Sequence, residues 1–256
     1  MIIRDAQIKA MEAAAEGNYI GELIAHCREF APGPVSAMSD DELKKAVTGG
    51  VDEAGRHGFD LRGPVRFYVD LMLAFGSGFA ADPQYPWAAE ILEKEEEMGQ
   101  MERAEALNEK TQEAFTGIFG EKNEYSTKAL EKMLEKVKAG IAFKREGFKQ
   151  DMLLLLKEVY PQKFEVVGEA ALKKLITEAI ARGRDRYGFK APRSMALVVV
   201  LMYAFGHRFD VDPFLPWISR TLKPKQDVPP DELAADLEKR VVTWFEVAVK
   251  TAREGN

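Results

Sequence analysis

The feature that most constrains this chain is a segment that it carries twice. "LMLAFGSGFAADPQYPW" (Leu71–Trp87) returns 130 residues later as "LMYAFGHRFDVDPFLPW" (Leu201–Trp217). When Arg56–Trp87 is aligned with Arg186–Trp217 without gaps, 14 of 32 positions are identical. Upstream, and with one gap, "ELKKAVTGGV" matches "ALKKLITEAI" and "REFAP" matches "KEVYP". This self-similarity indicates a tandem duplication and predicts two pseudo-equivalent lobes.

Both copies are predicted to be helical. Ser39 followed by Glu42 is a capping box before "LKKAV", and Gly58 and Gly188 stand where helices end. The apolar segments "PVRFYVDLMLAF" and "MALVVVLMYAF" are predicted to be buried helices. "LVVV" alone could be a strand, but its counterpart "RFYVDL" carries a charge at each end and favours a helix. The predicted fold class is all-α, with two pseudo-repeat helical lobes joined by long helices.

The middle of the chain is rich in Ala, Glu, Lys and Leu, which are strong helix formers. We expect two long helices there, broken near "GIFGEKNEYS", and one more amphipathic helix at the C-terminus with proline in its first turn. The predicted domains are an acidic lobe at 1–100, a helical connector at 101–139, and a second lobe with the C-terminal helix at 140–256.

Composition and charge exclude several classes of protein. The net charge is −6, and it divides into −9 over residues 1–100, −1 over 101–139 and +4 over 140–256. A nucleic-acid binder would need a dominant basic surface, which this chain lacks. The longest apolar runs are shorter than a membrane span, and the charged N-terminus is not typical of a signal peptide. The single cysteine, Cys27, fits a reducing compartment, so we expect a cytoplasmic protein.

The repeated DPxxPW signature is interpreted as structural. An Asp at a helix N-cap with Pro next to it is a common way to start a short helix, and the Trp that follows offers a large apolar surface. The alternative is a paired carboxylate site or ligand pocket. No His, Ser or Cys is kept in both copies to act beside the Asp, which favours the structural interpretation. The signature residues are Asp82, Pro83, Pro86, Trp87, Asp212, Pro213, Pro216 and Trp217.

Other candidate sites are weak. His26, His57 and His207 have no His or Cys partner at metal-binding spacing, so we expect no metal and no cofactor. "GSGFAAD" lacks the Lys and Ser/Thr of a phosphate-binding loop. The arginines of "ARGRDRYGFK", which are Arg182, Arg184 and Arg186, are expected at a solvated helix end. We predict no catalytic residues.

The first lobe carries an excess of acidic residues that the second lobe lacks. Two lobes of one architecture with opposite charge suggest that one surface has specialised for binding a partner, although most charge runs are solvated faces. The candidate binding residues are Asp40, Asp41, Glu42, Asp52, Glu53, Asp60, Glu90, Glu93, Glu95, Glu96 and Glu97.

The order "RHGF…YVDLMLAFGSGFAADPQYPWA", after a start of "MIIR" with Gln7, resembles a bacterial family associated with type VI secretion loci. The resemblance covers about residues 1–100 and, in degenerate form, 140–220. Repeat two departs from repeat one at His207 and Arg208, which stand opposite Ser77 and Gly78. Genes at such loci encode effectors together with immunity proteins or effector chaperones, so the resemblance implies one of these two roles.

These observations lead to a hypothesis of a non-enzymatic immunity protein that blocks a co-encoded effector toxin. A nuclease fits as the toxin, because a basic substrate cleft would attract an acidic inhibitor. The alternative is an effector-loading chaperone or adaptor. A third interpretation, less favoured, is a small helical enzyme or ligand-binding protein that uses the groove between the lobes. The expected partner is a protein with a basic surface, not a nucleic acid or a membrane.

Overall fold

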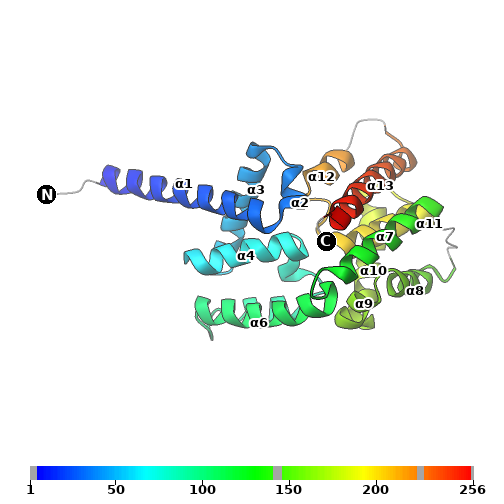
Figure 1. Ribbon diagram of the computed structural model, residues 1–256, viewed down its shortest axis with the longest axis horizontal. Coiled ribbons are helices and arrows are strands. Elements are labelled where there is room, and N and C mark those ends of the chain that lie inside the picture. The colour runs from blue at the N-terminus through cyan, green and yellow to red at the C-terminus, as the bar shows by residue number, and fades with distance from the viewer. Residues whose placement is uncertain (1–4, 141–145, 224–227, 255–256) are drawn as a thin grey trace.

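A computed structural model describes residues 5–140, 146–223 and 228–254. Within these ranges the regular structure is all helical with no strand, which confirms the predicted fold class (Figure 1). In chain order the helices are α1 (Asp5–Phe30), α2 (Pro32–Ser36), α3 (Asp40–Arg56), α4 (Arg62–Phe75), the 3₁₀ turn η1 (Phe79–Ala81), α5 (Pro86–Leu92), α6 (Gln100–Phe119), α7 (Glu124–Ala139), α8 (Phe148–Val159), α9 (Pro161–Val167), α10 (Glu169–Tyr187), α11 (Pro192–Phe205), α12 (Pro216–Leu222) and α13 (Pro230–Glu254).

The capping and glycine signals in the sequence mark helix ends as predicted. The Glu42 amide donates to the Ser39 hydroxyl oxygen at 3.3 Å, and the Ser39 amide donates to the Glu42 carboxylate at 3.0 Å, which completes the capping box of α3. Gly58 and Gly188 follow the ends of α3 and α10, each with a φ of +68° that suits glycine. The second apolar segment is the helix α11, and not a strand.

The prediction of two long helices in the middle of the chain was wrong about their extent. The first stretch is interrupted between Leu92 and Gln100, and the second ends at Ala139, after which Gly140 has a φ of +67°. Ala, Glu, Lys and Leu favour a helix wherever they stand, so their propensity did not reveal the breaks. The end of α7 at Gly140 has the left-handed glycine that also follows α3 and α10.

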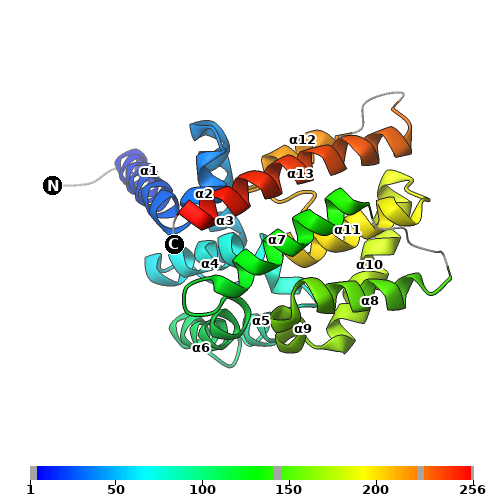
Figure 2. The ribbon, with the colours of Figure 1, turned by 45° about the vertical axis from the view of Figure 1, so that its right-hand side comes forward.

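The element order of the first copy recurs in the second. Helices α4 and α11 begin and end 130 residues apart, and so do α5 and α12. Helix α3 packs on α4 as α10 packs on α11, and α6 contacts α4 and α5 as α13 contacts α11 and α12 (Figures 1 and 2). The division into two lobes at the boundaries given above stays a prediction.

Helix α11 lies at the centre of the packing. Every residue from Ala196 to Tyr203 is buried, although the run includes three consecutive valines. β-Branched residues have low helix propensity, but burial on all sides outweighs it. No single described helix has the length and apolarity to cross a bilayer, and α10 and α11 pass that test only as a pair bent by 118°.

The buried arginine Arg103 joins two connections of the first copy. Its guanidinium donates to the carbonyl oxygens of His57 at 2.7 Å and Leu92 at 3.2 Å, and lies over the Phe59 ring at 4.8 Å. Only 2% of Arg103 is exposed. The α3–α4 turn is therefore held against the α5–α6 connector, and this contact positions the acidic residues described below.

Replacement of Arg103 tests this anchor. Arg103→Ala should lower the free energy of unfolding by about 2–4 kcal/mol, because two buried carbonyl oxygens lose their donor and a cavity opens. Arg56→Ala, an exposed arginine on the same turn, should cost less than about 1 kcal/mol. Urea denaturation of both variants measures the difference, and equal costs would contradict the anchoring role.

Candidate functional site

The signature aspartates of the two copies meet and bind each other's turns. The Asp82 carboxylate accepts the backbone N–H of His207 at 2.7 Å, and the Asp212 carboxylate accepts that of Ser77 at 2.7 Å. Ser77 and His207 are equivalent positions in the alignment. The bonding is thus reciprocal, as in a two-fold interface between identical subunits.

Each aspartate also fixes its own turn. The second oxygen of Asp82 accepts the N–H of Gln84 at 2.8 Å, and that of Asp212 accepts the N–H of Phe214 at 2.8 Å. Such bonds to the residue two positions on form Asx turns. The prediction that these aspartates are N-caps was wrong, because α5 and α12 begin at the second proline of each signature. The carboxylates are already occupied by the turn and by the other copy.

Two glycines allow the turns to touch through their backbones. Gly76 has a φ of +93° and Gly206 a φ of +90°. A β-carbon on Gly206 would lie 2.7 Å from the Phe75 carbonyl oxygen, and one on Gly76 would overlap the Phe205 carbonyl oxygen. Any side chain at either position would both strain the backbone and separate the turns.

The signature tryptophans, Trp87 and Trp217, are both half-buried. Trp87 meets the Phe75 ring edge-on at 5.9 Å. Trp217 stacks on Trp244 of α13 at 6.4 Å. The two rings therefore pack against the core in different ways.

A buried lysine lies beside this centre. Lys163 of α9 is 5% exposed, and its ammonium group donates to the Tyr203 carbonyl oxygen at 2.5 Å. The group also lies over the rings of Tyr203 and Tyr85, at 4.8 and 5.7 Å. Burial lowers the pKa of Lys163 to about 8, and the charge of Asp82 acts in the opposite direction. Sequence reasoning missed Lys163, because "PQKFEVV" looks like any amphipathic turn of helix.

The chemistry of the centre is that of a sealed polar junction. Burial raises the pKa of Asp212, while hydrogen bonds from the Ser77 and Phe214 amides oppose that rise. Both signature aspartates are 2% exposed. Carboxylates that are buried and bonded to backbone amides hold segments together, which supports the structural interpretation of the DPxxPW signature.

The predicted acidic residues fall into two separate groups. Asp40, Asp41 and Glu42 lie at the start of α3, where Asp40 pairs with Arg28 at 2.5 Å and Glu42 pairs with Arg220 of α12 at 2.7 Å. Ten residues of helix separate Glu42 from Asp52, or about 15 Å. The first group is therefore partly neutralised within the chain and lies apart from the rest.

The second group surrounds the α3–α4 turn and is called the acidic edge here. The Gln100 amide donates to the Asp60 carboxylate at 2.5 Å, and a β-carbon on Gly58 would overlap the Glu95 carboxylate. The charges of Glu53 and Glu95 both act on His57, whose pKa is nevertheless lowered by its burial. Glu90 is exposed on α5, outside the edge. The acidic edge consists of Asp52, Glu53, Asp60, Glu93, Glu95, Glu96 and Glu97.

The prediction of a solvated helix end holds for Arg184 and Arg186, which are exposed, but was wrong for Arg182, which is half-buried. Arg182 and Arg186 contact the fully buried carboxylate of Asp210, at 2.6 and 2.9 Å. Tyr187 also donates its hydroxyl to Asp210, while Arg184 pairs with its neighbour Asp185. Asp210 stands where the first copy has Ala80, and this departure from the repeat was the available signal.

The remaining reactive side chains are also partnered or buried. His26 bonds to the Asp70 carboxylate at 2.7 Å. Cys27 is fully buried, and burial raises its pKa to about 11, so its thiol stays protonated and unreactive at neutral pH. Within the described ranges, no group of three or more His, Cys, Asp or Glu side chains is arranged to hold a metal ion.

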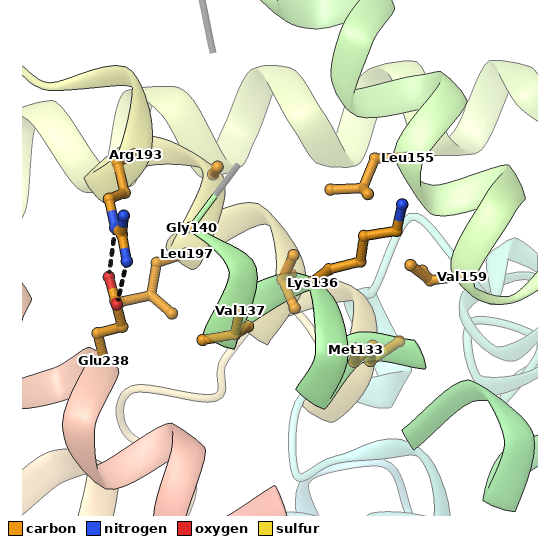
Figure 3. A pocket seen from close by; sticks show the side chains of 11 residues that line it. Met133, Lys136, Val137, Gly140, Leu155, Val159, Arg193, Leu197 and Glu238 are labelled. Atoms are coloured by element: carbon orange, nitrogen blue, oxygen red, sulfur yellow. Dashed lines mark hydrogen bonds and ion pairs between the residues drawn. The ribbon is translucent and has the colours of Figure 1, made fainter. Parts of the chain in front are cut away.

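An apolar hollow lies among α7, α8, α11 and α13 (Figure 3). Arg193 and Glu238 close one side with two hydrogen bonds of 2.8 and 2.5 Å, and Lys136 pairs with Glu158 at 2.5 Å. The hollow measures about 50 Å³. Ligand pockets usually span several hundred cubic ångströms, so this space does not define a substrate site.

Comparisons with known proteins identify no relative. No protein-family model, curated protein or solved structure matches the chain. The arguments about function therefore rest on the residues and their geometry.

The contact between the turns can be tested at Gly76. Gly76→Ala should lower the free energy of unfolding by about 1–3 kcal/mol, because alanine is strained at positive φ and its methyl would meet the Phe205 carbonyl. Gly49→Ala is a matched control in the middle of α3, where a β-carbon meets nothing within 4 Å. It should be neutral or stabilising by about 0.5–1 kcal/mol. Thermal melts that move equally would contradict the close approach.

Burial of Lys163 predicts a pH dependence of stability. Its pKa is about 8 in the folded chain and 10.5 when unperturbed, so between these values the unfolded state binds more protons and stability rises with pH. Wild type should gain about 1–2 kcal/mol over Lys163→Met between pH 7 and 9.5. Comparing the two proteins at each pH cancels the titration of other groups. A constant difference in unfolding free energy would show that Lys163 titrates normally.

Proposed function

We propose that this chain is a non-enzymatic cytoplasmic immunity protein that binds and neutralises a co-encoded effector toxin. The observation that carries the proposal is the acidic edge. It gathers residues from three separate parts of the first copy, namely the end of α3, the α3–α4 turn and the α5–α6 connector.

The edge has the charge that a basic partner requires. Its seven carboxylates stand against two exposed cations, Arg56 and Lys94, and the buried Arg103, which leaves a net charge of −4. Six of the seven residues are exposed, the exception being Glu53, which pairs with Arg56. A concentrated field of one sign accelerates association with an oppositely charged protein. The substrate cleft of a nuclease toxin is an oppositely charged surface of this kind.

The internal geometry agrees with a binding role. The two signature aspartates are bonded to backbone amides, and the Lys163 amine is bonded to a backbone carbonyl. An exposed and rigidly held charged surface is what a protein inhibitor presents to its target. Arg103 and Gln100 supply that rigidity by holding the α3–α4 turn, since the Gln100 side chain accepts the amides of Asp60 and Leu61 at 3.0 and 2.9 Å.

Charge reversal tests the proposal. Glu95→Lys, Glu96→Lys and Glu97→Lys, made together, should slow association with the effector encoded beside this chain by about tenfold or more at low salt. Raising the salt should slow wild type more than the variant, because the Debye length falls to about 10 Å at 0.1 M. Association rates by surface plasmon resonance measure both effects.

A matched control separates local from overall charge. Glu121→Lys, Glu146→Lys and Asp151→Lys change the net charge equally at exposed positions outside the acidic edge. This variant should keep the wild-type rate to within about threefold. Co-expression should rescue cells from the effector with wild type and the control, and fail with the edge variant. Binding without rescue would instead indicate an adaptor, and no binding would refute the proposal.

A further inference from the structure

One contact between the two parts of the chain is not repeated when the copies are exchanged. Helix α6 packs against α9, and a β-carbon on Gly117 would lie 2.6 Å from the Val166 side chain. The Tyr160 hydroxyl donates to the Ile118 carbonyl oxygen at 2.6 Å and closes the same contact. Gly117 permits the close approach of the two helices, and the Tyr160 hydrogen bond joins them.

With the copies exchanged, the equivalent pair is α13 and α2. Helices α6 and α13 begin 130 residues apart, so Trp244 and Val247 stand at the places of Ala114 and Gly117. The match of "REFAP" with "KEVYP" likewise puts Ala31 at the place of Tyr160. The large side chains of Trp244 and Val247 on α13 prevent the close approach, and Ala31 has no hydroxyl to form the hydrogen bond that Tyr160 forms.

The result is an open groove between α2 and α13, which lie beside each other in Figures 1 and 2. Two hollows of about 580 and 520 Å³ share Gly33, Trp244 and Val247, so they form one continuous surface. Val247 is 61% exposed. The indole N–H of Trp217, which lines the first hollow, is buried without an acceptor in the described part of the chain.

The groove carries positive charge at one end. Lys239 and Arg240 are exposed and line the first hollow, as do Arg220 and a single carboxylate, Asp236. Arg220 forms an ion pair with Glu42. No ion pair of Lys239 or Arg240 is found among the described residues. The surface thus combines two cations, one carboxylate and an apolar stretch around Trp244 and Val247.

We propose that this groove docks an acidic segment of a partner protein with an apolar anchor residue. Its carboxylate would bind Lys239 and Arg240, and its anchor would cover Trp244 and Val247. Arg240 and Val247 are seven residues apart on α13, or about 10 Å, which corresponds to two turns of a docked helix. The groove lies on other elements than the acidic edge, and this proposal does not depend on the immunity role.

The test uses two pools of fluorescein-labelled synthetic peptides of about twelve residues, the length that covers the groove. Both pools carry Leu, Ile or Phe at the same positions, and one carries Asp and Glu where the other carries Lys and Arg. By fluorescence anisotropy, the acidic pool should bind the full chain. Lys239→Glu with Arg240→Glu should weaken this binding about tenfold or more. Lys173→Glu with Lys174→Glu, an exposed pair on α10, is the control and should leave it unchanged.

Val247→Glu supplies an independent variant, because its side chain is exposed and its replacement should not disturb the fold. It should also weaken binding of the acidic pool, with an unchanged melting temperature. The proposal is overturned if neither pool binds, if the basic pool binds as well, or if the charge variant binds normally. It is also overturned if sedimentation shows wild type to self-associate and Val247→Glu to be monomeric, because the occupant would then be a second copy.

Discussion

The structure depends on the reciprocal bonds between the two turns that carry the repeated signature. Gly76 and Gly206 bring two backbones so close that the amides of Ser77 and His207 are turned toward the other copy. A buried amide without an acceptor costs on the order of 1–3 kcal/mol. An aspartate in each copy removes this cost for the other. Loss of either carboxylate would therefore affect both copies, and this explains why the chain carries the complete signature twice.

A reciprocal centre also shows how the copies could diverge around it. Arg208 stands opposite Gly78, and a β-carbon on Gly78 would lie 2.6 Å from the Arg208 side chain. The larger residue of one copy thus fits because its equivalent in the other is glycine. Asp210 likewise brings a buried charge, which is stabilised only because Arg182, Arg186 and Tyr187 of the same copy reach it. In these two departures from the repeat, the new side chain is matched by a residue nearby.

Much of the fold could be predicted from the sequence, because its signals are local. The capping box at Ser39, the helix ends at Gly58 and Gly188, and the helical state of the valine-rich segment follow from spacing and composition. The break at 93–99 was not predicted, and the end of α7 at Gly140 carries a local glycine signal that the prediction did not use. The cross-copy bonds of Asp82 and the burial of Lys163 could not be predicted either, since the residues involved are distant in sequence. For Asp210 the sequence did offer a signal, because this residue replaces Ala80 of the first copy.

The candidate binding residues show why an excess of charge in sequence differs from a charged surface. Glu42 and Glu95 are both acidic residues of the first copy, but Glu42 contacts Arg220 of the second copy whereas Glu95 lies exposed beside the α3–α4 turn. The Glu42–Arg220 pair joins the two copies, and its arginine lines the α2–α13 groove. Charge that is used inside the chain cannot attract a partner. The acidic edge and the two cations of the groove lie on different elements and have opposite sign, so the edge favours a basic partner surface and the groove an acidic one.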